Sequence, residues 1–151
     1  MNEDSLEKTK EIITDFFEKM TILADIEEQK LVDNLLKITL VSGEAQVLIG
    51  QQGKTLSDIQ NILAKMLRKK LDKEVFLDLD VNNYKSDKEQ RFRDLAQEAA
   101  DEAVSSGREK TLFPMPAFER RIIHTELAKR QDVKTESIGE AEERRVVIRP
   151  V

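Results

Sequence analysis

The sequence predicts an α+β protein that consists of two small domains. Stretches with apolar residues at helical spacing alternate with short stretches in which every second residue is apolar, the patterns of helices and half-buried strands. The polar, turn-like segment Asn82-Asn83-Tyr84-Lys85 interrupts these patterns near the middle of the 151 residues. We therefore expect one domain over residues 1–82 and a second over residues 86–151, because a chain of this length can form two small domains.

The first half predicts the element order α-β-β-α-α-β. Helical spacing of apolar residues predicts helices over residues 4–20, roughly 44–49, and from the turn at 50–53 to about residue 70. Alternating apolar residues predict strands over residues 22–27, 36–40 and 75–81. Thr55 and Asp58 have the spacing of a capping box at the start of the long helix. One three-stranded sheet covered on one face by helices would bury the apolar positions.

The second half predicts a helix, a short extended piece, a further helix and two strands. Ser86-Asp87-Lys88-Glu89 has the form of a capping box, and Gly107 is placed to end the helix that follows. Two prolines extend the segment Leu112-Phe113-Pro114-Met115-Pro116, and its last residue suits the first turn of a helix over about 117–130. Strands are predicted over residues 133–138 and 144–149, joined as a hairpin around Gly139-Glu140-Ala141-Glu142.

Several classes of protein are disfavoured by what the chain lacks. It has no cysteine, which excludes disulfides, thiolate metal sites and a cysteine nucleophile. A single histidine without His/carboxylate metal spacing leaves little for a hydrolase, so we expect no enzyme activity, no metal and no cofactor. No apolar run approaches about 18 residues and no signal-peptide pattern is present, so we expect a cytoplasmic protein without membrane insertion.

The stretch Val47-Leu48-Ile49-Gly50-Gln51-Gln52-Gly53-Lys54-Thr55-Leu56 reads as an apolar run, a Gly-x-x-Gly turn and the start of a helix. Its two glycines allow positive φ angles and the close approach of another backbone. Unpaired N–H groups at the helix start, with Lys54 beside them, would form a seat for a phosphate group. The alternative is an ordinary turn that leads into a helix, since such a short motif is weak evidence by itself.

The net charge of −5 is unevenly distributed along the sequence. Residues 50–73 carry six basic and two acidic side chains, and residues 108–151 carry ten basic and eight acidic ones, whereas the rest is acidic. Both basic stretches coincide with a motif, as a locally basic binding face on an acidic body would require. The alternative for residues 65–73 is a solvated helix end whose positive charge is favourable to the helix dipole.

Arg120 and His124 lie four residues apart in a predicted helix, so they share one face within contact distance. The histidine is the only one in the chain. An arginine beside a histidine suits a phosphate or a base, because the arginine supplies charge and directed donors while the histidine stacks or hydrogen bonds. The alternative is a surface pair in which the histidine packs against Ile123 or Leu127.

Both motifs resemble known domains. Leu48-Ile49-Gly50-Gln51-Gln52-Gly53-Lys54-Thr55-Leu56 resembles the signature turn of a KH domain. Phe113-Pro114-Met115-Pro116-Ala117-Phe118-Glu119-Arg120-Arg121-Ile122-Ile123-His124 resembles the core of the R-three-H domain, which is named for Arg-x-x-x-His, and Glu143-Arg144-Arg145-Val146-Val147-Ile148 resembles its last strand. Their order and spacing resemble the Jag family, also called SpoIIIJ-associated or KhpB proteins, over almost the whole chain.

The resemblance implies a KH-like domain followed by an R-three-H α/β domain, in a bacterial protein that binds single-stranded RNA without catalysing a reaction. In KH domains the glycine loop grips the backbone of a short single strand, and a groove beside it takes about four bases. Carried over by position, the implied RNA-binding residues are Ile49, Gly50, Gln51, Gln52, Gly53 and Lys54 in the loop, and Arg120, Arg121, His124 and Arg145 in the second domain.

The chain departs from the family pattern in two ways. Many relatives carry basic residues at the middle loop positions, where this chain has Gln51 and Gln52, so we expect weaker attraction for phosphate. The KH-like pattern begins almost at Met1, which predicts a short form without the N-terminal Jag domain of longer members.

Two functions follow from these motifs. The first is a tandem binder of single-stranded RNA, with single-stranded DNA as a further ligand, that serves as a post-transcriptional regulator or RNA chaperone; linking two weak sites would raise avidity. The second is a protein-interaction adaptor whose KH-like surface binds a small KH-domain partner protein or a second copy of the chain. The salt dependence of binding distinguishes the two functions. RNA binding should weaken steeply as the salt concentration rises, whereas a mostly apolar protein interface should be less sensitive.

Overall fold

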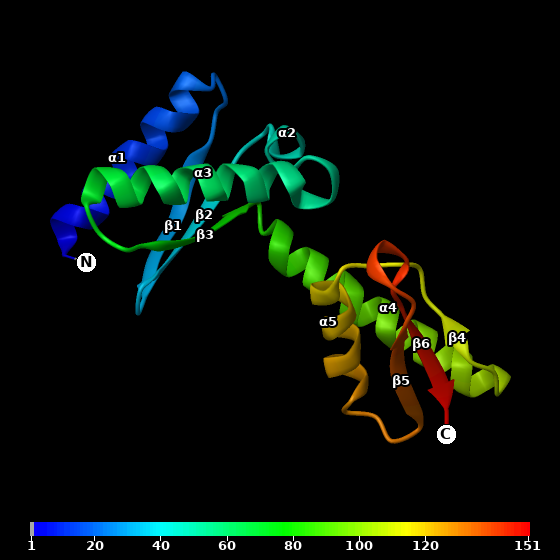
Figure 1. The fold of residues 1–151 in the computed structure, drawn as a ribbon. Coiled ribbons are helices and arrows are strands. Elements are labelled where there is room, and N and C mark those ends of the chain that lie inside the picture. Colours follow the sequence, from blue (N-terminus) through cyan, green and yellow to red (C-terminus); the bar gives the residue numbers. More distant parts are fainter. Residues whose placement is uncertain (1) are drawn as a thin grey trace. The chain divides into compact units, whose positions relative to one another are not determined.

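The structure is a computed structural model that describes residues 2–151. The chain divides into two compact units, residues 1–85 and residues 86–151, and each unit has a buried core of its own (Figure 1). Both units combine helices with a three-stranded sheet. The predicted α+β class with two small domains is therefore confirmed.

The first unit follows the predicted order α-β-β-α-α-β. Its elements are α1 (Glu3–Lys19), β1 (Asp25–Val32), β2 (Leu35–Val41), α2 (Ala45–Ile49), a 3-10 turn η1 (Gln51–Gly53), α3 (Lys54–Leu71) and β3 (Phe76–Val81). The strands lie in the order β1-β2-β3, with β1 antiparallel and β3 parallel to the central β2. Because parallel strands need a long crossover, α2, the glycine turn and α3 together connect β2 to β3.

The core of the first unit lies between one face of this sheet and the helices. Alternate residues of β2 are buried, namely Leu36, Ile38 and Leu40. They pack with buried residues of the helices, including Ile13, Phe17, Leu63 and Leu67. Burying each of these large side chains contributes about 1.5–3 kcal/mol, so this face fixes the register of the sheet and the position of α3. In Figure 1, α3 runs along the sheet and ends near the start of β3.

Two local predictions for the first unit were wrong. The strand predicted from residue 22 begins only at Asp25, because Ile22 and Ala24 pack against the core from the irregular chain that precedes β1. Thr55 and Asp58 do not form a capping box, since α3 already begins at Lys54 after an N-cap glycine without side-chain capping.

The second unit consists of two helices and a small sheet. Its elements are α4 (Tyr84–Ser106), whose first two residues belong to the first unit, β4 (Lys110–Thr111), α5 (Ala117–Leu127), β5 (Val133–Ile138), a 3-10 turn η2 (Ala141–Glu143) and β6 (Arg145–Pro150). The strand order is β4-β6-β5, with both outer strands antiparallel to β6. The predicted hairpin between the last two strands is confirmed, and Gly107, with a φ of +65°, follows the end of α4 as expected.

A stripe of small residues lets α4 pack closely in the second unit. The buried residues of this helix are Ala96, Ala99, Ala100 and Ala103. They share a core with Ile123 and Leu127 of α5 and with Val146 and Ile148 of β6. Glu119 of α5 is buried and forms an ion pair of 3.0 Å with Lys88 of α4, so charge as well as packing joins the two helices.

The predicted turn over residues 82–85 and the predicted capping box after it were wrong in detail. Only Asn82 and Asn83 form a turn, with left-handed φ angles of 50° and 57°, and α4 already begins at Tyr84. Ser86 therefore lies inside α4 rather than at its cap. The helix predicted over 117–130 ends at Leu127. No helix in the described range 2–151 is long and apolar enough to cross a membrane.

Candidate nucleic-acid interface

The Gly-x-x-Gly turn joins α2 to α3 with an unusual backbone. Gly50 has φ +68° and ψ −165°, a combination that is nearly restricted to glycine. Gln52 and Gly53 follow in the left-handed region, with φ angles of 54° and 81°. Ile49 is half-buried against the core of the first unit, whereas both glutamine side chains are exposed. The turn is thus anchored at its start and open at its middle.

Contacts as well as the φ angle require glycine at position 50, whereas at Gly53 the positive φ angle is the main requirement. A Cβ atom on Gly50 would lie 2.1 Å from Oγ1 and 2.7 Å from Cβ of Thr55, so no side chain fits there. A Cβ atom on Gly53 would lie 3.0 Å from Cε1 of Tyr84, whose ring therefore packs against the turn. The turn therefore has no room for a side chain at Gly50, and the Tyr84 ring lies close to Gly53.

The N-terminus of α3 leaves the turn without a side-chain cap. No side chain in the part of the chain that the structure describes caps this end, and the positive end of the helix dipole faces the turn. Lys54 adds one charge, although its Nζ forms an exposed ion pair of 3.3 Å with Asp58. An exposed pair of this kind contributes little stability, so an anion can compete for the lysine.

The structure bears on the two interpretations of the positive charge in residues 50–73. Arg68, Lys69 and Lys70 lie in the last turn of α3, which is roughly 20 Å along the helix from Lys54 at 1.5 Å per residue. Arg68 donates from Nε to the carbonyl of Val75, and its guanidinium lies over the Phe76 ring. Most of this positive charge therefore stabilises the end of α3, the alternative that the sequence left open.

The second motif lies on α5 of the second unit. Arg120 donates from Nε to the carbonyl oxygen of Met115 at 3.2 Å, which fixes the guanidinium near the start of the helix. Its two terminal nitrogens have no hydrogen-bond partner among residues 2–151. They keep the two-pronged donor geometry that binds a phosphate or carboxylate.

His124 bridges α5 and β5 through both ring nitrogens. Nδ1 lies 2.7 Å from Oγ1 of Thr135, and Nε2 lies 2.7 Å from Oγ of Ser137. Burial lowers the pKa of the imidazole, and the nearby positive charges of Arg120 and Arg144 lower it further. The ring is therefore neutral at pH 7, and the positive charge at this site comes from the two arginines.

The structure does not gather all the predicted residues at one place. Arg121 is exposed on α5, one position beyond Arg120. Arg145 pairs with Ile138 in the β5–β6 ladder, whereas Ser137 pairs with Val146, so strand alternation places Arg145 on the face away from His124. Arg145 also forms an ion pair of 2.9 Å with Glu143.

Sequence reasoning missed three residues around His124. Thr135 and Ser137 follow the buried Val133 at alternate positions of β5. This spacing places the two hydroxyl groups on the same face of the strand as Val133, and it was the one sequence feature that could have indicated them. Arg144 precedes β6 and donates from Nη1 to the carbonyl of Gly139 at 2.9 Å, a contact that no sequence pattern announces. Within residues 2–151 no group of three or more His, Asp or Glu side chains could hold a metal ion.

Comparison with known proteins gives both units a family. Residues 11–86 match the family model of the KH domain, and residues 90–150 match that of the R-three-H domain.

Proteins named RNA-binding protein KhpB are similar to most of the chain. The one from Clostridium symbiosum is 29% identical over 143 residues, which cover 94% of this chain and 64% of that protein. The one from Lactiplantibacillus plantarum is 34% identical over 102 residues, which cover 68% of this chain and 32% of that protein. The one from Bacillus subtilis is 32% identical over 111 residues, which cover 72% of this chain and 53% of that protein. This chain thus spans roughly a third to two thirds of the length of these relatives. With a KH domain followed by an R-three-H domain, the chain belongs to the KhpB (Jag) family.

Proposed function

We propose that this chain binds single-stranded RNA through the Gly-x-x-Gly turn and the Arg120/His124 surface, and acts as a post-transcriptional regulator or RNA chaperone without catalysing a reaction. The observation that carries the proposal is the pre-shaped turn at Gly50, which leads directly into the uncapped start of α3. A phosphate placed there would meet backbone N–H groups and the positive end of a helix dipole. The names of the similar proteins support an RNA ligand rather than a free phosphate.

The second unit contributes a separate contact with a phosphate. The terminal nitrogens of Arg120 are available to an anion, and Arg144 adds positive charge beside a neutral His124. We assign the histidine a positioning role, since both its ring nitrogens are already bonded to hydroxyls of β5. Single-stranded DNA has the same phosphates, so contacts of this kind alone do not exclude it.

Fluorescence anisotropy with a labelled mixed-sequence single-stranded RNA tests the loop. The variant with Gln51→Asp and Gln52→Asp places two carboxylates where the phosphates would lie, and both positions are exposed, so the fold should persist. We expect roughly five- to tenfold weaker binding, since a unit charge pair at about 4 Å in water is worth about 1 kcal/mol.

A matched control adds the same charge at positions outside the turn. Asn34→Asp lies in the turn between β1 and β2, at the opposite end of β2 from the glycine turn, and Gln131→Asp lies in the turn before β5; both positions are exposed. We expect this double variant to bind like the wild type. Equal weakening in both double variants would mean that overall charge, and not the glycine turn, governs binding.

An adaptor function has one observation in its favour. Val32, Leu35 and Phe76 are directly opposite one another across β1, β2 and β3, on the sheet face turned away from the core. Val32 and Phe76 are 43% and 47% exposed, and Arg68 lies over one face of the Phe76 ring, so the row forms a small, partly covered apolar strip that a protein partner could contact. Phe76→Ser would then abolish partner binding or self-association and leave RNA affinity unchanged, as analytical ultracentrifugation and anisotropy would show.

A further inference from the structure

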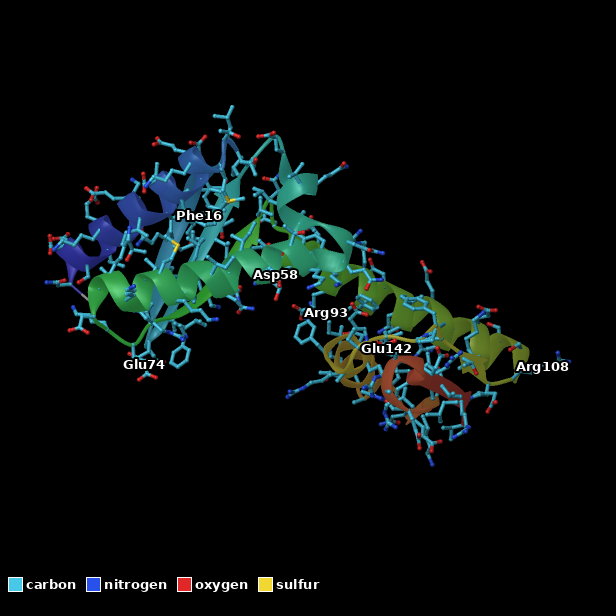
Figure 2. The ribbon with its side chains drawn as sticks, turned by 45° about the horizontal axis from the view of Figure 1, so that its top comes forward. Phe16, Asp58, Glu74, Arg93, Arg108 and Glu142 are labelled. Atoms are coloured by element: carbon cyan, nitrogen blue, oxygen red, sulfur yellow. The ribbon has the colours of Figure 1, made fainter. Side chains whose placement is uncertain are left out.

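A shallow groove of about 250 Å³ lies between α4 and α5 of the second unit. Glu89 and Arg93 border it from α4, and Phe118, Arg121 and Ile122 border it from α5. Arg93 is labelled on α4 in Figure 2. The groove is smaller than the 300–1,000 Å³ typical of small-molecule pockets, so its size suits one planar group better than a whole ligand.

The apolar part of the groove is an aromatic ring left open to solvent. Phe118 is 69% exposed, whereas Ile122, one helical turn later, is half-buried. Large exposed aromatic side chains beside positive charge are the usual platform on which the bases of single-stranded nucleic acid stack. Because every base has a flat π-face, such a contact needs no particular sequence.

The charges in the groove leave one cation without a partner. Arg93 forms an ion pair with Glu89, and Lys129 forms one of 2.9 Å with Glu126, so both carboxylates are already neutralised. Hydrogen bonds from Lys129 and Gln97 lower the pKa of Glu126, which keeps it ionised within its pair. Arg121 has no hydrogen-bond or ion-pair partner among residues 2–151. Its free guanidinium beside an exposed ring is complementary to a phosphate next to a base.

The groove adjoins the Arg120/His124 surface around α5. Residues three apart on a helix differ by about 60° around its axis, so Arg121 lies between His124 and Phe118. We propose that the α4–α5 groove is an additional RNA contact in which one base stacks on Phe118 while Arg121 binds the neighbouring phosphate. The proposal rests on the proposed RNA-binding function and extends its binding surface across α5.

Tryptophan fluorescence can report on this contact directly, because the chain contains no tryptophan. Phe118→Trp places the only fluorophore of its kind in the groove, and a stacked base should quench it when single-stranded RNA binds. Phe113→Trp is the matched control, since Phe113 is 54% exposed in the same unit but does not border the groove. We expect quenching at position 118, little change at position 113, and little quenching by an abasic oligonucleotide with the same phosphates.

Affinity measurements test separately the stacking by Phe118 and the phosphate binding by Arg121. Phe118→Leu keeps an apolar side chain but removes the π-face, so we expect RNA affinity to fall by about fivefold or more. Phe118→Tyr keeps the π-face and should keep the affinity. Arg121→Ala should weaken binding more than Arg108→Ala. Arg108 is an equally charged exposed residue in the turn after α4, about 20 Å along the helix from Arg93 at 1.5 Å per residue (Figure 2).

The outcomes separate this inference from the proposed function. RNA binding that weakens in the Gln51→Asp, Gln52→Asp variant, together with an unquenched tryptophan at position 118 and unchanged affinity of Phe118→Leu, would overturn the groove contact and leave the function standing. No binding of RNA by the wild-type chain would overturn both. Quenching at position 118 with loss of affinity in Phe118→Leu and Arg121→Ala would establish the groove as part of the RNA surface.

Discussion

Gly50 is the single residue on which the shape of the candidate loop depends most. Its φ of +68° and ψ of −165° are open essentially to glycine alone, and Thr55 occupies the space that a Cβ atom would need. We predict that Gly50→Ala lowers the free energy of unfolding of the first unit by about 1–3 kcal/mol or more and weakens RNA binding. Urea denaturation followed by circular dichroism measures the first effect and anisotropy the second.

Gly43 offers a control within the same unit. No heavy atom lies within 4 Å of a Cβ atom built there, and its φ is not positive, so Gly43→Ala should change stability by less than about 0.5 kcal/mol. A Gly50→Ala variant as stable as the Gly43→Ala variant would contradict the role assigned to the turn backbone.

His124 gives the second unit a predictable dependence on pH. The unfolded imidazole has a pKa of about 6.5, and burial followed by repulsion from Arg120 and Arg144 lowers the pKa in the folded unit. Below about pH 6.5 the unfolded chain therefore binds more protons at this residue than the folded one. The contribution of His124 to the stability of the folded unit is complete above that pH and is lost progressively as the pH falls through the lowered pKa.

We predict that the thermal unfolding midpoint of the wild type falls more than that of His124→Gln between about pH 7.5 and pH 5.5. Glutamine keeps polar groups near Thr135 and Ser137 but does not titrate. Since His124 is the only histidine, the difference between the two proteins isolates this ring. Parallel pH profiles in differential scanning calorimetry would show that its protonation is not coupled to folding.

At the scale of the elements, the alanine stripe of α4 decides how closely that helix packs. Ala100 is fully buried in the core of the second unit, among Ile123, Leu127 and Val146. We predict that Ala100→Leu destabilises the second unit by about 1–3 kcal/mol through overpacking. Ala128→Leu, at the exposed end of α5, is the control and should have little effect in the same urea titration. Equal stability of the two variants would mean that the helix can move away from the sheet at no cost.

The sequence predicted correctly the strands that bury one face. It predicted less well the start of the edge strand β1 and the starts of the helices. The strands β2 and β3 alternate strictly because every second residue is buried, so their positions were readable. The edge strand β1 contains the polar run Glu27-Glu28-Gln29-Lys30, and the alternation read from Ile22 belongs to the chain before it. The two predicted capping boxes were wrong because each helix begins earlier, directly after a residue with a positive φ angle, Gly53 or Asn83. No spacing rule predicts these φ angles.

The sequence predicted several residues of the candidate site, but not their hydrogen-bond partners or which of them lie together. Spacing on a helix places Arg120 beside His124 whatever the rest of the fold does. The hydroxyl partners of the histidine come from β5, and the separation of Arg145 from the site depends on strand register; both are products of tertiary packing. The groove beside Phe118 requires α4, which is distant in the sequence.

We propose phosphate contacts on both units of the chain. The first unit offers the backbone of the glycine turn with a single lysine, and the second offers arginine side chains around a neutral histidine. We expect each contact to be weak alone, because few charges take part and the lysine of the loop forms an ion pair. Two linked weak contacts on one RNA strand would raise the overall affinity through effective concentration.

If RNA contacts the backbone of the glycine turn, the amide chemical shifts of that turn should change when RNA binds. We would titrate the ¹⁵N-labelled chain with a short mixed-sequence single-stranded RNA and follow its two-dimensional NMR spectrum. We expect the amide signals of residues 50–55 to shift first, with further shifts around Arg120 and Phe118. Unchanged signals at residues 50–55 at saturating RNA, with shifts elsewhere, would contradict an RNA contact at the turn.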